Sequence, residues 1–139
     1  MNYLTAFGLF LGRVALCTIF ILAGVGKFLN YDGTAQYMAS KGMTMIPIFL
    51  VLAALVEICG GLSLLLGLRA RMGATLLFLF LIPVTIIFHD FWNLTGPDKQ
   101  AQMIEFLKNL GIFGGLLYVM SIGPGPWSID AYAGHEKLS

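Results

Sequence analysis

The chain has 139 residues, of which 58% are hydrophobic and only 11% are charged, whereas soluble domains carry about 25% charged residues. Its mean hydropathy is +0.87. The formal net charge is +1, with no dense cluster of Lys or Arg, which argues against nucleic acid as a partner. This composition predicts an integral membrane protein surrounded by the lipid bilayer.

Four apolar runs in the chain are long enough to cross a membrane, since a spanning helix needs about 20 such residues. They predict helices at about residues 5–29, 47–68, 72–91 and 103–122. The last run ends at Gly123-Pro124, where a helix cannot continue. We therefore expect an all-α membrane protein, a four-transmembrane-helix bundle, with residues 1–139 in a single domain and both termini on one side.

The first apolar run is predicted to remain in the mature protein. Arg13 interrupts it, no basic segment precedes it, and no small-residue cleavage site follows it, unlike a secretory signal peptide. Between the first two spans, residues 33–45 are predicted to form a short interfacial helix. Basic residues are nearly balanced between the two faces, and we favour a cytoplasmic position for the turn with Arg69 and Arg71.

Neither a disulfide nor a metal site is predicted. Cys17 and Cys59 both lie in apolar runs and form no C-x-x-C pair, so we expect both to pack between helices. The chain shows no set of His, Cys and carboxylate residues at the spacing of metal ligands.

Two charged residues, Arg13 and Glu57, lie inside predicted membrane spans. A charge at the centre of a membrane helix costs about 2.5 to 3.5 kcal/mol and usually faces a partner inside the protein. Counted from the side of the termini, Arg13 lies roughly 12 Å deep and Glu57 roughly 16 Å deep. These similar depths predict an Arg13–Glu57 ion pair, which would serve either as a structural lock or as part of a functional site.

A second group of polar residues is predicted near the opposite membrane surface. It consists of Lys27, His89, Lys108 and Asn109. With Arg13 and Glu57 these residues would bound a polar pocket inside the bundle, open on the face opposite the arginine turn. A simpler alternative is that the lysines extend to the headgroups without binding a ligand.

Small residues at helical spacing predict close packing between helices. The glycines predicted to pack in this way are Gly8, Gly12, Gly60, Gly61, Gly111 and Gly115.

Six short motifs occur in order along most of the chain. They are Gly24-Val25-Gly26-Lys27, Val56-Glu57 with Gly60-Gly61, Gly67-Leu68-Arg69-Ala70-Arg71, Phe88-His89-Asp90-Phe91, Phe106-Leu107-Lys108-Asn109, and Gly123-Pro124-Gly125 with Ser128-Ile129-Asp130. Their order and spacing resemble the DoxX family of small bacterial membrane proteins. The resemblance implies a four-helix bundle in the inner membrane, related to the membrane subunits of archaeal thiosulfate:quinone oxidoreductase. A few members of the family are linked to oxidative-stress complexes or to chaperone-like roles.

Two classes of function fit these residues. One is a quinone-linked redox subunit: the pocket would accept a quinone, with Glu57 or His89 as a proton donor and a cation to stabilise the developing anion. In this case the chain would be part of an oxidoreductase with a partner redox protein. The other is a non-enzymatic scaffold or assembly factor, acting with a partner or as a homo-oligomer. An anionic lipid is an alternative guest, and transport of a small anion or proton is a third, less favoured function.

Overall fold

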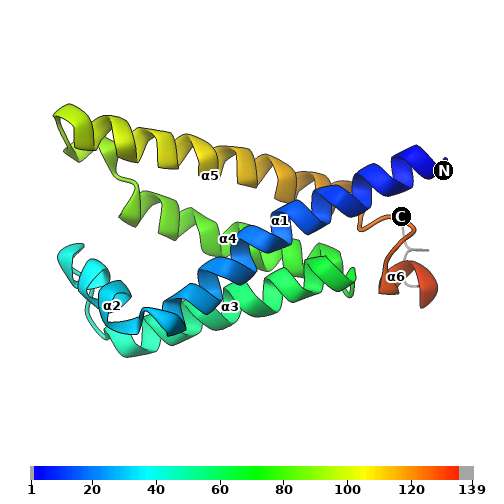
Figure 1. The fold of residues 1–139 in the computed structure, drawn as a ribbon, viewed down its shortest axis with the longest axis horizontal. Coiled ribbons are helices and arrows are strands. Elements are labelled where there is room, and N and C mark those ends of the chain that lie inside the picture. The colour runs from blue at the N-terminus through cyan, green and yellow to red at the C-terminus, as the bar shows by residue number, and fades with distance from the viewer. Residues whose placement is uncertain (1, 135–139) are drawn as a thin grey trace.

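The computed structural model describes residues 2–134, and its dominant elements are four long helices (Figure 1). These are α1 (Tyr3–Leu29), α3 (Ile46–Leu66), α4 (Ala70–Phe88) and α5 (Gly96–Ile122). Three shorter elements accompany them: α2 (Tyr31–Ser40), the 3-10 helix η1 (Phe91–Asn93) and α6 (Ile129–Tyr132). Each long helix is long and apolar enough to cross a membrane. The predicted all-α, four-span architecture is confirmed, while residues 1 and 135–139 of the predicted domain lie outside the described residues.

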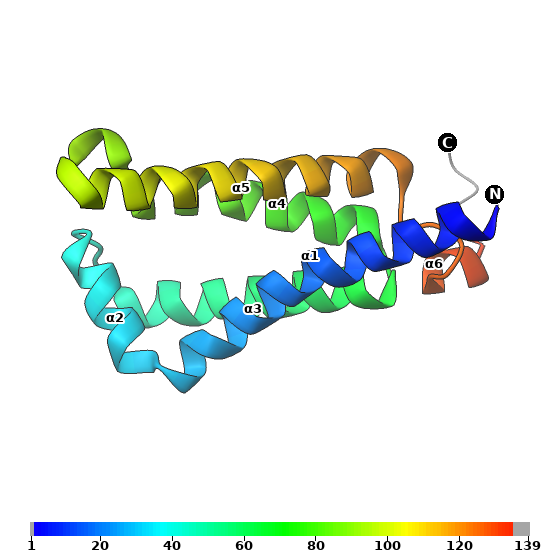
Figure 2. The same cartoon turned by 45° about the horizontal axis from the view of Figure 1, so that its top comes forward.

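The long helices form two layers, with α1 packed on α3 and α5 packed on α4 (Figure 2). Contacts between α3 and α4 hold the layers together, whereas α1 and α5 touch only over a short stretch. One end of the bundle carries α2 and η1, and the other carries the start of α1, the α3–α4 turn and α6 (Figure 1). Residues 2–134 thus begin and end on the same side, as predicted for four spans.

Close contacts through glycine fix the axial position of α1 against α3. A Cβ added to Gly24 would lie 2.8 Å from the backbone oxygen of Ala54, and one added to Gly61 would lie 2.7 Å from Ile21 Cγ1. Near the other end of this contact, Gly67 lies against the guanidinium of Arg13. The C-terminal half of α1 therefore packs along the middle of α3, and Arg13 lies at the level of the α3–α4 turn.

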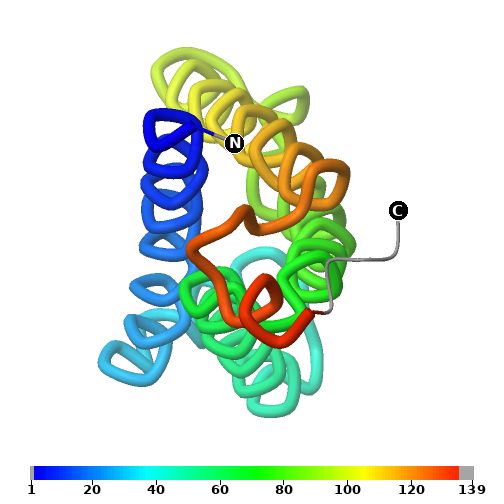
Figure 3. The backbone as a smooth tube through the Cα atoms, turned by 90° about the vertical axis from the view of Figure 1, so that its right-hand side faces the viewer, coloured from blue at the N-terminus to red at the C-terminus, as the bar shows by residue number. Residues whose placement is uncertain are grey.

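The segment after α5 crosses the end of the bundle (Figure 3). Hydrogen bonds join this segment to the α3–α4 turn. The two carboxylate oxygens of Asp130 accept hydrogen bonds from the backbone N–H groups of Arg69 (2.8 Å) and Ala70 (3.0 Å). Asp130 N–H donates in return to the carbonyl oxygen of Gly67, at 2.9 Å. Because the first N–H groups of a helix have no partner within it, Asp130 caps α4 from a distant part of the chain.

The fourth span begins earlier and is rotated differently from the prediction. α5 starts at Gly96, whereas the span was predicted from residue 103. The first two turns are polar and so do not belong to an apolar run. Its buried residues are Leu116 and Val119, whereas Lys108 and Gly111, predicted to face inward, are exposed. Glycine spacing alone does not show which side of a helix faces its neighbours.

The glycines predicted to pack between helices divide into two groups. An added Cβ would meet Leu77 at Gly60, Ile21 at Gly61 and Leu16 at Gly115, all within 3 Å. The remaining three have nothing within 4 Å of that position: Gly8, Gly12 and Gly111. The close packing predicted for these three is not seen in residues 2–134: Gly8 and Gly12 line a gap of about 210 Å³ between α1 and α5, and Gly111 is exposed.

Candidate functional site: a cavity beneath α2

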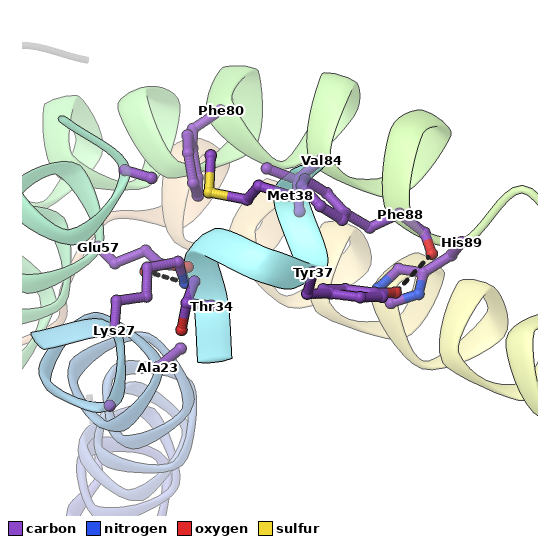
Figure 4. A pocket seen from close by; sticks show the side chains of 12 residues that line it. Ala23, Lys27, Thr34, Tyr37, Met38, Glu57, Phe80, Val84, Phe88 and His89 are labelled. Atoms are coloured by element: carbon purple, nitrogen blue, oxygen red, sulfur yellow. Dashed lines mark hydrogen bonds and ion pairs between the residues drawn. The ribbon is translucent and has the colours of Figure 1, made fainter. Parts of the chain in front are cut away.

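A cavity of about 330 Å³ lies between α1, α3 and α4 and is covered by α2 (Figure 4). Its walls are mainly apolar and aromatic, and they include Met38, Phe80, Val84 and Phe88. The volume lies within the range of roughly 300 to 1,000 Å³ that is typical of small-molecule sites. Of the residues predicted to bound a polar pocket, the structure brings Lys27, Glu57 and His89 to this cavity.

An ion pair between Lys27 and Glu57 lies at one end of the cavity (Figure 4). Lys27 Nζ is 2.6 Å from Glu57 Oε2, and the two side chains are 22% and 7% exposed. The predicted Arg13–Glu57 pair is therefore wrong. Gly67, which contacts Arg13, is ten residues beyond Glu57, or roughly 15 Å along a helix. The depth estimate failed because it started both helices at the same level, whereas α1 extends beyond the end of α3 (Figure 1).

Arg13 belongs instead to the end of the bundle that carries α6. It is 2% exposed, its Nη2 donates to the carbonyl oxygen of Trp127, and its guanidinium lies 5.9 Å from the ring centroid of Phe10. Arg13 thus holds the segment after α5 against α1. It does not line the cavity beneath α2.

The other two predicted pocket residues, Lys108 and Asn109, also lie elsewhere. Lys108 Nζ pairs with Glu105 Oε1 at 2.6 Å on the exposed side of α5. Asn109 Nδ2 donates to Thr85 Oγ1 at 2.9 Å and so joins α5 to α4. The positions of both side chains follow from the rotation of α5, which turns Asn109 toward α4 and Lys108 away from it.

His89 lies at the opposite end of the cavity from the ion pair (Figure 4). It follows directly after α4, and its Nδ1 is 2.9 Å from Gln102 Oε1 on α5. Gln102 was not a predicted site residue, and nothing in its sequence position distinguishes it from the polar residues around it. Only the packing of α5 beside the end of α4 reveals its role.

The predicted interfacial helix exists as α2, and it forms the cover of the cavity. The Tyr37 hydroxyl donates to the carbonyl oxygen of Phe88 at 3.2 Å. Lys41 Nζ, just after α2, pairs with Asp90 Oδ1 at 2.7 Å. Met38 is the buried residue of α2. Both polar contacts connect the cover to the end of α4, next to His89.

The fold and this cavity define an integral membrane protein of four spanning helices, with a ligand-sized, aromatic-lined cavity at the end of the bundle that carries α2. The DoxX family model matches residues 8–90, and the chain belongs to the DoxX family.

Curated relatives support this assignment. The chain is 35% identical over 122 residues to inner membrane protein YphA of Escherichia coli, covering 88% of this chain and 87% of the relative. It is also 35% identical over 131 residues to inner membrane protein YqjF of the same organism, covering 94% and 95%. The putative oxidoreductase CatD of Bacillus subtilis is 33% identical over 86 residues, which is 62% of this chain and 63% of CatD. No solved structure matches significantly. The chain is thus an integral protein of the inner membrane.

Proposed function

We propose that this chain is the quinone-binding membrane subunit of a redox system whose electron donor is carried by another protein. The observation that supports the proposal is the cavity beneath α2, where aromatic rings separate a lysine at one end from a histidine at the other. A quinone is a flat apolar ring with an oxygen at each end. The cavity offers the ring apolar walls and each oxygen a polar neighbour.

The chemistry of quinone reduction matches the residues at the two ends. Reduction adds two electrons and two protons to the ring, one proton on each carbonyl oxygen. Lys27 would stabilise the negative charge that develops on one oxygen, and His89, when protonated on both ring nitrogens, would deliver a proton to the other and be left as the neutral ring. The two electrons come from a redox cofactor or dithiol of the partner protein. The name of the relative CatD, a putative oxidoreductase, is consistent with such a role.

The proposal is tested by filling the cavity without disturbing the packing of the helices. Gly26 lines the cavity, and a Cβ added there meets nothing within 4 Å. We therefore expect Gly26→Leu to retain the fold but to weaken the binding of a short-chain quinone at least tenfold. Gly12→Leu is the matched control, since Gly12 is on the same helix with equally open space but does not line the cavity.

Binding is measured as the shift in thermal unfolding on titration with decylubiquinone in detergent micelles, because a ligand that binds only the folded protein stabilises it. The proposal is wrong if the wild-type protein does not respond, or if Gly26→Leu binds as well as Gly12→Leu. Stabilisation by phosphatidylglycerol instead of quinone would identify an anionic lipid as the guest. A protein that co-purifies in stoichiometric amount without quinone binding would favour the scaffold function.

A further inference from the structure

The hydrogen bond between His89 and Gln102 determines which nitrogen of the imidazole carries hydrogen. Gln102 Oε1 lies 2.9 Å from His89 Nδ1, and an amide oxygen can only accept a hydrogen bond. Nδ1 must therefore be the donor. In the neutral ring the other nitrogen, Nε2, is then an acceptor. His89 thus offers the cavity a lone pair.

The two hydroxyl groups of α2 that line the cavity also present only lone pairs to it. Tyr37 donates its hydroxyl hydrogen to the carbonyl oxygen of Phe88 at 3.2 Å. Thr34 donates its own to the carbonyl oxygen of Asn30 at 2.9 Å. A hydroxyl has one hydrogen and two lone pairs, so each of these groups can only accept a further hydrogen bond.

The ion pair at the other end of the cavity offers both kinds of group. Lys27 has three N–H donors, and one of them is directed to Glu57 Oε2. The remaining N–H groups of Lys27 can donate to a ligand oxygen. Donors are therefore available at the Lys27 end, while the Tyr37 and His89 end presents acceptors.

We infer that the cavity binds the reduced quinol form more tightly than the oxidised quinone, an inference that rests on the proposed function. A quinone carries two carbonyl oxygens, which only accept. One of them can accept from Lys27, but the other would face the lone pairs of Tyr37 and His89, and a polar group left without a partner is costly. A quinol can accept from Lys27 with one hydroxyl and donate to His89 Nε2 with the other.

This preference would make the bound quinone a stronger electron acceptor than the free one. Each hydrogen bond gained contributes a net stabilisation that corresponds to roughly a fivefold change in affinity. One or two such bonds at the Tyr37 and His89 end give quinol an advantage of about five- to thirtyfold. For a two-electron couple, a tenfold preference raises the midpoint potential by about 30 mV. Electrons from a partner protein would thereby be drawn to the quinone in this cavity.

The experiment compares the dissociation constants of decylubiquinone and decylubiquinol, the latter kept reduced under argon with dithionite. Wild-type protein should bind quinol about five- to thirtyfold more tightly. Gln102→Leu removes the acceptor that holds hydrogen on Nδ1, so His89 can place it on Nε2 and donate to quinone. We expect this variant to bind the two forms within about twofold of each other, mainly through tighter quinone binding. Gln100→Leu, at an exposed position on the same helix, should keep the wild-type ratio.

The tautomer itself is visible by ¹⁵N NMR of labelled histidine. The chain has two histidines, so His135→Gln leaves His89 as the only signal. Hydrogen on Nδ1 in this protein, and a change of tautomer on Gln102→Leu, are the expected results. Equal or tighter binding of quinone by the wild type would overturn the inference but leave the proposed function intact. Failure of both forms to bind would overturn both.

Discussion

Lys27 Nζ on α1 lies 2.6 Å from Glu57 Oε2 on α3, so the two helices with the closest mutual packing are also joined by an ion pair. Glu57 is buried, with its side chain 7% exposed, while Lys27 is 22% exposed beside the cavity. Removing either charge leaves the other without this partner inside the membrane, which is more costly than exchanging both for apolar groups.

Lys27→Met and Glu57→Leu should therefore each lower the free energy of unfolding by about 3 kcal/mol. The double variant should lose less than the sum of the two, with a coupling of roughly 1 to 3 kcal/mol. Unfolding in mixed micelles with increasing SDS measures these values. In the matched cycle, Arg13→Met and Glu57→Leu should be additive within about 0.5 kcal/mol. A larger coupling to Arg13 than to Lys27 would contradict the structure.

Two glycines of α1 should respond in opposite ways to the addition of one methyl group. In Gly24→Ala the new Cβ would lie 2.8 Å from the carbonyl oxygen of Ala54, and backbone atoms cannot move away cheaply. We expect a loss of about 1 to 3 kcal/mol. Gly12→Ala meets open space and should be neutral or stabilising by up to about 1 kcal/mol, because Ala favours the helix. Equal effects in SDS unfolding would show that α1 does not approach α3 at Gly24.

The carboxylate of Asp130 should contribute measurably to stability through α4. Asp130→Ala leaves the backbone N–H groups of Arg69 and Ala70 without their acceptor, which for a helix cap costs about 0.5 to 2 kcal/mol. The stability of Asp130→Asn should lie between that of the wild type and that of Asp130→Ala, since the amide retains one acceptor oxygen. The exposed Glu105→Gln is the control, because surface ion pairs are worth only about 0 to 1 kcal/mol. A larger effect for Glu105→Gln would argue against the cap.

The ion pair between Lys41 and Asp90 should hold α2 over the cavity. The side chains of Lys41 and Asp90 are 19% and 22% exposed. An ion pair in contact with solvent is worth about 0.2 to 1 kcal/mol, so Lys41→Ala should barely change global stability. It should increase amide hydrogen exchange in residues 31–40 about two- to fivefold, since α2 opens more often. The exchange of residues 46–66 should not change. Lys108→Ala, which removes the pair with Glu105 on the exposed side of α5, provides a control that should leave α2 unaffected.

The candidate site could be predicted from the sequence only in part. Lys27, Glu57 and His89 are predicted as site residues because charged or titratable residues in apolar runs are costly, and the structure places all three at one cavity. The same reasoning predicts Lys108, which instead lies on the exposed side of α5. For a lysine near the end of a span the rule is weak, since its side chain can reach the headgroups from almost any orientation.

The number of spans and the inward face of α1 can be predicted from the sequence alone. Span number follows from the length of apolar runs, because a bilayer of fixed thickness requires it. The inward face of α1 follows from helical spacing, because Arg13, Cys17 and Phe20 recur every three or four residues and all are buried.

The axial position of α1 along α3 and the rotation of α5 are seen only once the helices are packed together. The face of a helix repeats every turn, so the same stripe of small residues allows several axial positions of α1 against α3. The close contacts at Gly24 and Gly61 select one of them. In this position Glu57 pairs with Lys27, and Arg13 lies at the end of the bundle, where it donates to Trp127. The cover formed by α2 and the Gln102 contact to His89 depend on residues distant in the chain, which local periodicity cannot reveal.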